Sequence, residues 1–213
     1  MGMIAGFLAL RLYSVLGRRA KHEEEVIQGR IDPVPGTPRT HQEPRKADAL
    51  PQQQKLRELP VVPPAVERGL HDIAAVDRRF DAPAFIDGAR HAYRMILEAF
   101  WRGDKDELAS LVDRDVYENF AGEIDARIAA GETVENRLVR IEEVSISDAS
   151  YDAPMARITV RFVADIAALT RDKDGTAIAG SLDDALVTRD LWTFSRNVTA
   201  TAPDWLLDET DEA

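Results

Sequence analysis

The most regular alternation of polar and apolar positions in this chain lies at residues 186–198. In an extended chain, Asp190, Trp192, Phe194 and Arg196 point to one side, and the residues between them point to the other. Two aromatic side chains on one side of a strand carry a large apolar area, so that side must be buried. We therefore predict that residues 186–198 form the central strand of a sheet that covers the main core.

The same period of two governs the whole C-terminal half, from Gly131 onward. It predicts further strands over residues 133–147, 156–169 and 205–208. The run Arg-Asp-Lys-Asp-Gly at residues 171–175 has the composition of a hairpin turn, which predicts antiparallel neighbours. No internal repeat is evident, so the expected sheet is one antiparallel meander of about four strands.

Before Gly131, apolar residues recur at helical spacing instead. Helices are predicted over residues 66–80, 83–102, 105–112 and 115–130. Asp81 and Asp104 have the composition of helix N-caps, and Gly103 and Gly131 that of helix ends. Helices followed by an antiparallel meander predict an α+β fold, with the helices packed on one face of a curved sheet.

The first 17 residues are apolar except for Arg11, and basic residues follow them. Roughly 20 apolar residues are needed to cross a bilayer, so this run is short for a span. A signal peptide, an interfacial amphipathic helix, a signal anchor and a helix docked on the domain are the open interpretations. We favour a membrane anchor over residues 1–17, with its basic end and the domain on the cytoplasmic side of an inner membrane. Its expected membrane contacts are Ile4, Phe7, Leu8, Leu10, Leu12, Val15, Leu16, Arg18 and Arg19.

Residues 18–65 are rich in proline and contain three consecutive glutamines at 52–54. Such a composition cannot bury enough apolar area to build a core, so we expect a flexible linker. The chain would then consist of an anchor at residues 1–17, a linker at 18–65 and a folded domain at 66–213. A linker of this kind lets a domain reach away from a membrane surface.

The charge is distributed unevenly between these parts. The chain has a net charge of −11. Residues 1–65 contain ten Lys/Arg and seven Asp/Glu, which gives +3 and leaves −14 for the remainder. An acidic domain argues against nucleic acid as a partner. The absence of cysteine excludes disulfides, thiol nucleophiles and cysteine metal sites.

Motifs that carry chemistry are missing from the sequence. The histidines, His22, His41, His71 and His91, show no metal-binding spacing. Asp172 and Asp174 precede a glycine, but the rest of a calcium loop is absent, so they are expected to be turn residues. There is no glycine-rich phosphate loop and no nucleophile elbow. We therefore expect no metal, no cofactor and no catalytic residue.

Asp190 is the one polar residue on the buried side of the central strand that needs an explanation. A buried carboxylate requires a partner, and the first hypothesis is an ion pair with Arg157 or Arg161 of the neighbouring strand. The alternative is a general base in an isomerase or dehydratase, which would need a second polar group such as Tyr93 or Tyr117 in the same pocket.

Several short motifs, taken in order, resemble those of one family. They are Phe-Ile-Asp-Gly-Ala-Arg at 85–90, Tyr-Arg-Met-Ile-Leu-Glu-Ala-Phe at 93–100, Val-Tyr-Glu-Asn-Phe at 116–120, Ile-Thr-Val-Arg-Phe at 158–162, Asp-Leu-Trp-Thr-Phe-Ser-Arg at 190–196 and Pro-Asp-Trp-Leu-Leu at 203–207. Over residues 66–210 the chain thereby resembles the Tim44-like family. That family includes the C-terminal domain of the mitochondrial inner-membrane import-motor anchor and its alphaproteobacterial relatives. The apolar start that ends in Gly-Arg-Arg at 17–19 is similar to the bacterial members.

The resemblance implies a cone of the kind seen in nuclear-transport-factor-two-like and cystatin-like folds, and it implies no catalysis. The mitochondrial relative is a scaffold that holds a DnaK-type chaperone at a protein-conducting channel and contacts cardiolipin-rich membrane. By resemblance, this chain is expected to be a membrane-proximal adaptor with a protein partner, and an acidic phospholipid as a possible second one. The expected binding cleft lies between the helices and the sheet, with Tyr93, Phe100, Trp101 and Tyr117 as candidates for its lining. A lipid-binding module that holds an acyl chain in the cone is a further hypothesis.

Overall fold

The computed structural model describes residues 63–201 and 204–212. The predicted anchor at 1–17, with Ile4, Phe7, Leu8, Leu10, Leu12, Val15, Leu16, Arg18 and Arg19, lies outside the described residues, as does nearly all of the predicted linker. In chain order the elements are α3 (Pro64–Val76), α4 (Ala82–Arg102), α5 (Lys105–Leu111), α6 (Arg114–Ala130), β1 (Thr133–Asp152), β2 (Met155–Arg171), β3 (Ala177–Asn197) and β4 (Leu206–Glu212). Within the described residues, no helix is both long and apolar enough to cross a membrane.

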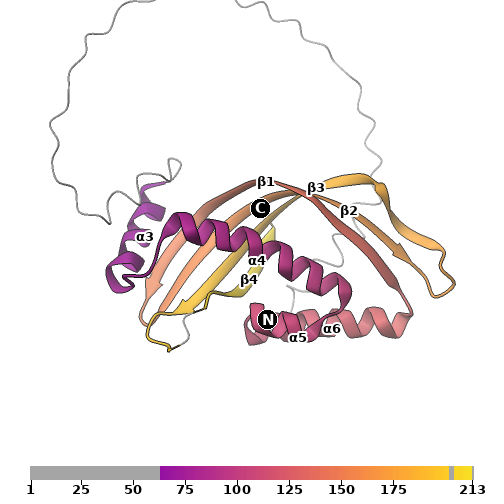
Figure 1. The fold of residues 1–213 in the computed structure, drawn as a ribbon, viewed down its shortest axis with the longest axis horizontal. Helices are drawn as coiled ribbons and strands as arrows, with labels where there is room; N and C mark the ends of the chain where they lie inside the picture. The colour runs from indigo at the N-terminus through magenta and orange to yellow at the C-terminus, as the bar shows by residue number, and fades with distance from the viewer. Residues whose placement is uncertain (1–62, 202–203, 213) are drawn as a thin grey trace, which may run out of the picture.

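The strands form one antiparallel sheet in the order β1-β2-β3-β4, which confirms the predicted α+β class and the meander. Figure 1 shows the sheet as an arc, with the helices gathered on its concave side. The arc has a local cause in β1, whose pairing with β2 shifts register at Leu138/Arg140, Ile141/Glu143 and Ile146/Asp148. Each such irregularity bends and twists its strand, so long strands curl around the helices.

The helix boundaries follow from side-chain caps, of which the sequence indicated Asp81 and Asp104 but not Asp113, which caps α6 one residue before its start at Arg114. Asp81, Asp104 and Asp113 each accept a hydrogen bond from a backbone N–H of the first turn of α4, α5 and α6, respectively. Gly103 and Gly131 end α4 and α6 with φ values of 74° and 71°, a left-handed conformation that glycine adopts without strain.

One helix is shorter than predicted. α3 ends at Val76 and does not continue to Phe80. The reason is Asp77, which has an extended backbone and whose carboxylate Oδ1 accepts a hydrogen bond from the backbone N–H of Arg79, at 3.0 Å. A local bond of this kind competes with the helix.

The hairpin between β2 and β3 is the turn that was predicted at 171–175. Asp172 Oδ1 accepts from the backbone N–H groups of Asp174 and Thr176, at 2.9 and 2.8 Å, and Gly175 has a φ of 81°. These bonds make Asp172 a turn residue. β3 itself begins at Ala177, earlier than the predicted 186, and its first half extends with β2 beyond the end of α4 (Figure 1).

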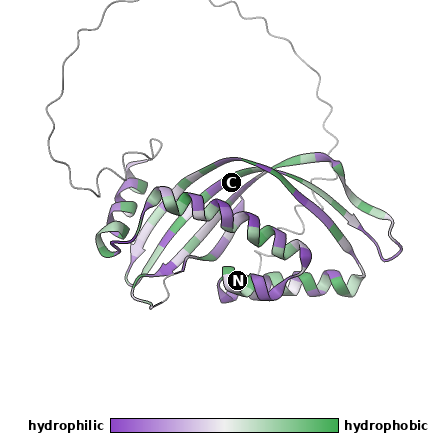
Figure 2. Cartoon of the chain, viewed as in Figure 1, coloured by the Kyte–Doolittle hydropathy of each residue, from purple (hydrophilic) through white to green (hydrophobic). Residues whose placement is uncertain are grey.

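The core lies between the concave face and the helices. Along the strands, hydrophobic and hydrophilic residues alternate (Figure 2), as a sheet covered on one side requires. The predicted parity of β3 is confirmed, because Asp190, Trp192, Phe194 and Arg196 are all buried. Trp192, Tyr93 and Phe162 are the largest fully buried side chains and meet at the centre.

Candidate functional site

Asp190 is paired with Tyr93, which the sequence analysis named only under its alternative hypothesis, and not with either arginine. The hydroxyl of Tyr93, on α4, donates a hydrogen bond to Asp190 Oδ2 at 2.7 Å, inside the core. The predicted pairing with Arg157 or Arg161 is wrong, since these arginines bond Asp208 and Glu143. The cause is strand parity: Asp190 lies opposite Phe162, on the concave side of β2, whereas Arg157 and Arg161 project from the convex side.

The surroundings of the Tyr93–Asp190 pair are aromatic. The ring of Tyr93 stacks on Phe162, with centroids 4.3 Å apart, and lies 4.6 Å from the centroid of Trp192. Both members of the pair are buried. Together they form a polar link between α4 and the sheet in the middle of an apolar core. The pair therefore helps to hold α4 in place on the sheet.

We expect Tyr93→Phe to lower the free energy of unfolding by about 1–3 kcal/mol, because it leaves a buried carboxylate without this donor. Urea unfolding of the purified protein measures the change. Tyr117→Phe is the matched control, since Tyr117 is half-buried on α6 and has no side-chain hydrogen bond among the described residues. Equal losses in the two variants would contradict the role assigned to Tyr93.

The other predicted cleft residues lie at separate points of the core. Phe100 packs against Phe120, with ring centroids 5.0 Å apart, and Arg127 lies over its ring. Burial lowers the pKa of Arg127, whose Nη2 also donates to the Phe100 and Trp101 carbonyls. Trp101 Nε1 lies 3.1 Å from the side-chain oxygen of Asn136 once that amide is oriented to receive it.

A hollow of about 460 Å³ opens at a different place, beside the N-terminal half of α4. None of Tyr93, Phe100, Trp101 and Tyr117 lines it. It is bordered by the segment between α3 and α4, by α4 itself, by the end of α5, by the end of β3 and by the segment before β4. The lining residues are Arg79, Phe80, Asp81, Ala84, Phe85, Gly88, Ala89, Ala92, Ser110, Leu111, Phe194, Arg196, Asp204 and Trp205.

The α4 wall of the hollow consists of small residues. Ala84, Gly88 and Ala92 follow one another at intervals of four, so they lie on one face of the helix. At 1.5 Å per residue, this face runs for roughly 12 Å. A Cβ added at Gly88 would meet nothing within 4 Å. The wall therefore allows another chain to come close to the helix backbone.

The apolar part of the hollow is aromatic. The ring of Phe85 lies 4.8 Å from Trp205 and 6.1 Å from Phe194, and Phe80 lies 6.1 Å from Trp205, centroid to centroid. Trp205 remains half-buried, so part of its indole faces solvent. Spacing along α4 could have revealed the small wall in advance. The aromatic floor could not be foreseen, because it joins residues from distant segments.

Of the polar residues that line the hollow, only Arg196 is buried. Its side chain is 8% exposed, and Nη2 lies 2.7 Å from Oδ2 of Asp77, whose side chain is 6% exposed. This is the distance of an ion pair, although the angles are not those of a hydrogen bond, and both Asp77 Oδ2 and Arg196 Nε are buried without a hydrogen-bond partner. The guanidinium carbon also lies 5.7 Å from the centre of the Trp205 ring.

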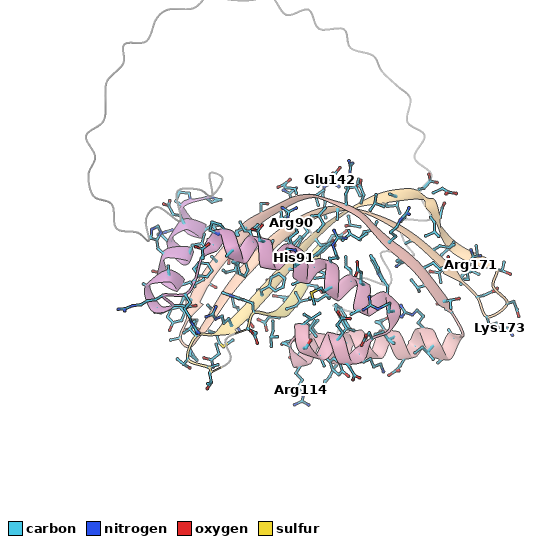
Figure 3. All side chains as sticks on the ribbon, in the orientation of Figure 1. Arg90, His91, Arg114, Glu142, Arg171 and Lys173 are labelled. Carbon is cyan, nitrogen blue, oxygen red and sulfur yellow. The ribbon has the colours of Figure 1, made fainter. Side chains whose placement is uncertain are left out.

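The described residues contain no cluster of His, Asp or Glu side chains that could hold a metal ion. His71 and His91 are exposed on different helices, and each places Nδ1 within 2.8 Å of the carbonyl one turn earlier. The charged side chains labelled in Figure 3 project outward, such as Arg114 from α6 and Lys173 from the β2–β3 hairpin. Among the described residues, the hollow is an open space at the surface that another molecule could enter.

Comparison with protein families finds a match to the Tim44-like domain over residues 66–212. Comparison with curated proteins finds no match. Among solved structures, the intermembrane space region of the chloroplast protein ARC6 is similar, with 9% sequence identity and a TM-score of 0.44. That match covers 60% of this chain and 95% of the ARC6 chain.

Proposed function

Since the chain belongs to the Tim44-like domain family, we propose that it is a non-enzymatic adaptor that presents this domain to a protein partner at a membrane surface. Tim44-like domains are generally non-catalytic binding domains. The observation that carries the proposal is the open hollow beside α4, with its small-residue wall and aromatic floor. Asp190, the one candidate general base, lies outside the lining of that hollow and is buried against Tyr93.

The membrane part of the proposal rests on the sequence of residues 1–17. We propose that this segment anchors the chain in the inner membrane and that the linker carries the domain into the cytoplasm. Protein translocation or membrane-protein assembly is the setting in which such an adaptor would work, as the family resemblance suggests.

Fractionation tests the anchor. The full chain is expected in the membrane pellet after a high-salt wash, because apolar insertion does not depend on ionic strength. A variant that lacks residues 1–17 is expected in the supernatant. If the full chain stays in the supernatant, the anchor proposal fails.

Photo-crosslinking tests the hollow as the docking site. A photoreactive phenylalanine analogue is placed at Ser110 of the full chain, in its native membranes, and at Gly122 as the control. Both positions are exposed on helices, but only Ser110 lines the hollow. We expect crosslinks to a defined protein from position 110 and not from position 122.

Leucine at Gly88 or at Gly122, with the photoreactive residue kept at position 110, gives a loss-of-binding test. Gly88→Leu and Gly122→Leu should each keep or slightly raise thermal stability, because leucine favours a helix over glycine by about 0.5–1 kcal/mol. Only Gly88→Leu should remove the crosslinked partner, since its side chain fills the hollow. Retained binding in Gly88→Leu would overturn the docking site, and a crosslink to lipid alone would favour the lipid-binding hypothesis.

A further inference from the structure

One edge of the sheet is open to another strand. β4 pairs only with residues 190–195 of β3, so among the described residues the earlier part of β3, 177–188, has a strand neighbour on one side only (Figure 1). We propose that residues 185–188 of this edge bind an extended segment of a partner protein, which joins the sheet as an additional strand. The segment has apolar residues in its middle and a basic residue at each end. None of the residues 185–188 lines the hollow, so this contact surface goes beyond the proposed function.

The first argument is that residues 185–188 lack the protection that the other outer edge has. β1 shifts register against β2 three times between Leu138 and Asp148, has charged residues along this part, and lies against α3 near its end. Irregularities, charges and helix cover keep other chains from pairing with an edge strand. Residues 185–188, by contrast, read Ala-Leu-Val-Thr and pair with β2 in unbroken register. An uncharged, regular edge is a template for one more strand.

The second argument is that apolar side chains are exposed at this edge on both faces of the sheet. Leu186 is 38% exposed and Val187 is 48% exposed, and neighbours in a strand point to opposite faces. On the convex face, Val163 and Ala167 of β2 are buried without being part of the main core, and Ala185 lies opposite Ala167. A strand added beside residues 185–188 would extend this apolar row and cover both exposed side chains. Its central residues are therefore apolar.

The third argument is charge, because carboxylates stand at both ends of the stretch. Asp183 and Asp184 precede it in β3, and Asp211 and Glu212 end the neighbouring β4; all four residues are exposed. Arg189 offsets only one of these charges. A basic residue at each end of the partner segment is thus attracted to the edge.

The same charges argue against a second copy of this chain as the occupant. Two such edges side by side would bring a second set of four carboxylates to the contact, and the domain as a whole is acidic. Like charges brought together in this way disfavour association. The occupant is therefore a different protein segment, with charge opposite to that of the edge.

Binding of blocked peptides to the full chain, in detergent micelles, tests the inference. The probe is acetyl-Lys-Thr-Val-Val-Thr-Lys-amide, and hydrogen exchange followed by mass spectrometry shows which backbone segments it protects. We expect slower exchange at residues 185–188 of β3 and no change at residues 135–146 of β1.

Two altered peptides separate the contributions. With Glu in place of both Lys residues, binding should weaken by at least about tenfold, because two ion pairs are replaced by repulsion. With N-methyl groups on the four central residues, protection should disappear, since the side chains and charges remain but the N–H donors to the edge are lost.

Protein variants then locate the contact. Val187→Lys gives this edge the kind of protection that β1 has, and it should remove binding of the Lys peptide. Val139→Lys is the matched control, because Val139 is 47% exposed on β1, and it should bind like the wild type. Both side chains are about half exposed, so both variants should stay folded, which circular dichroism checks.

A second pair of variants tests the charges. Asp183→Asn/Asp184→Asn should weaken binding of the Lys peptide several-fold. Asp72→Asn/Asp87→Asn removes two exposed carboxylates from α3 and α4 and should leave binding unchanged.

Four results would overturn the inference. They are no protection at millimolar peptide, equal protection of the β1 and β3 edges, self-association of the full chain that Val187→Lys abolishes, and slow exchange of residues 185–188 without peptide at every protein concentration. The third result would mean that a second copy occupies the edge, and the fourth that a segment of the chain itself does. Crosslinks from position 110 report on the hollow alone, so the docking site there and this edge can fail separately.

Discussion

Replacing Gly69 with alanine is expected to destabilise the domain by more than about 3 kcal/mol, beyond the usual range for overpacking. Gly69 lies in α3, and a Cβ at this position would stand 1.8 Å from the backbone oxygen of Ala149 in β1. That atom belongs to a strand backbone in the sheet, so it cannot move away as a flexible side chain would. Urea unfolding, followed by tryptophan fluorescence, measures the loss.

Gly122→Ala is the matched control and should have the opposite sign. Gly122 also lies inside a helix, but its Cβ would meet nothing within 4 Å. Helix propensity alone then favours alanine, by about 0.5–1 kcal/mol. A stabilising effect of Gly69→Ala, equal to that of Gly122→Ala, would show that α3 does not lie against β1 as described.

The close contact at Gly69 also lets α3, the first helix of the described domain, lie directly against β1. α3 buries Val66, Leu70 and Ile73, and packs against β1, which is an edge strand of the sheet. Helix cover protects an edge strand from pairing with other chains. The Gly69→Ala variant is therefore expected to aggregate when it is partly unfolded, in addition to being less stable.

Local chemistry made most of the fold predictable. The caps at Asp81 and Asp104 and the stops at Gly103 and Gly131 act within one turn of chain, so sequence alone fixes them. The buried side of β3 could likewise be predicted, because successive side chains of a strand point to opposite faces of the sheet.

Long-range contacts set the rest. The sequence offered Tyr93 and Tyr117 equally as polar neighbours of Asp190, and only the crossing of α4 over the concave face of the sheet selects Tyr93. The two possible donors on the neighbouring strand, Arg157 and Arg161, had the right charge but the wrong parity. The role of Gly69 was equally hidden, because only the approach of β1 distinguishes it from Gly122.

The candidate site was the least predictable part for the same reason. Its aromatic floor joins Phe85 of α4, Phe194 of β3 and Trp205 before β4. The sequence placed the aromatic residues in the core, and the structure shows that a few of them border an opening. An opening forms where side chains from distant segments leave space between them, and no local sequence pattern predicts such a space.

Replacing Asp77 with alanine is expected to cost about 3–5 kcal/mol, the range for removing one partner of a buried ion pair. The loss arises because Arg196 would keep its charge while it remains buried, with no carboxylate at 2.7 Å. The backbone N–H of Arg79 would also lose its acceptor, which loosens the turn after α3. Thermal unfolding and urea unfolding should both show that Asp77→Ala is less stable than the wild-type protein.

The double variant Asp77→Ala/Arg196→Met should be more stable than Asp77→Ala, because apolar groups often replace a buried ion pair at little cost. If the loss of stability in the double variant equals the sum of the losses in Asp77→Ala and Arg196→Met, the pairing of Asp77 with Arg196 is contradicted, since residues in direct contact are coupled. If the double variant recovers stability, the cost of Asp77→Ala comes from the charge of Arg196, and Asp77 is the group that makes the burial of this guanidinium tolerable.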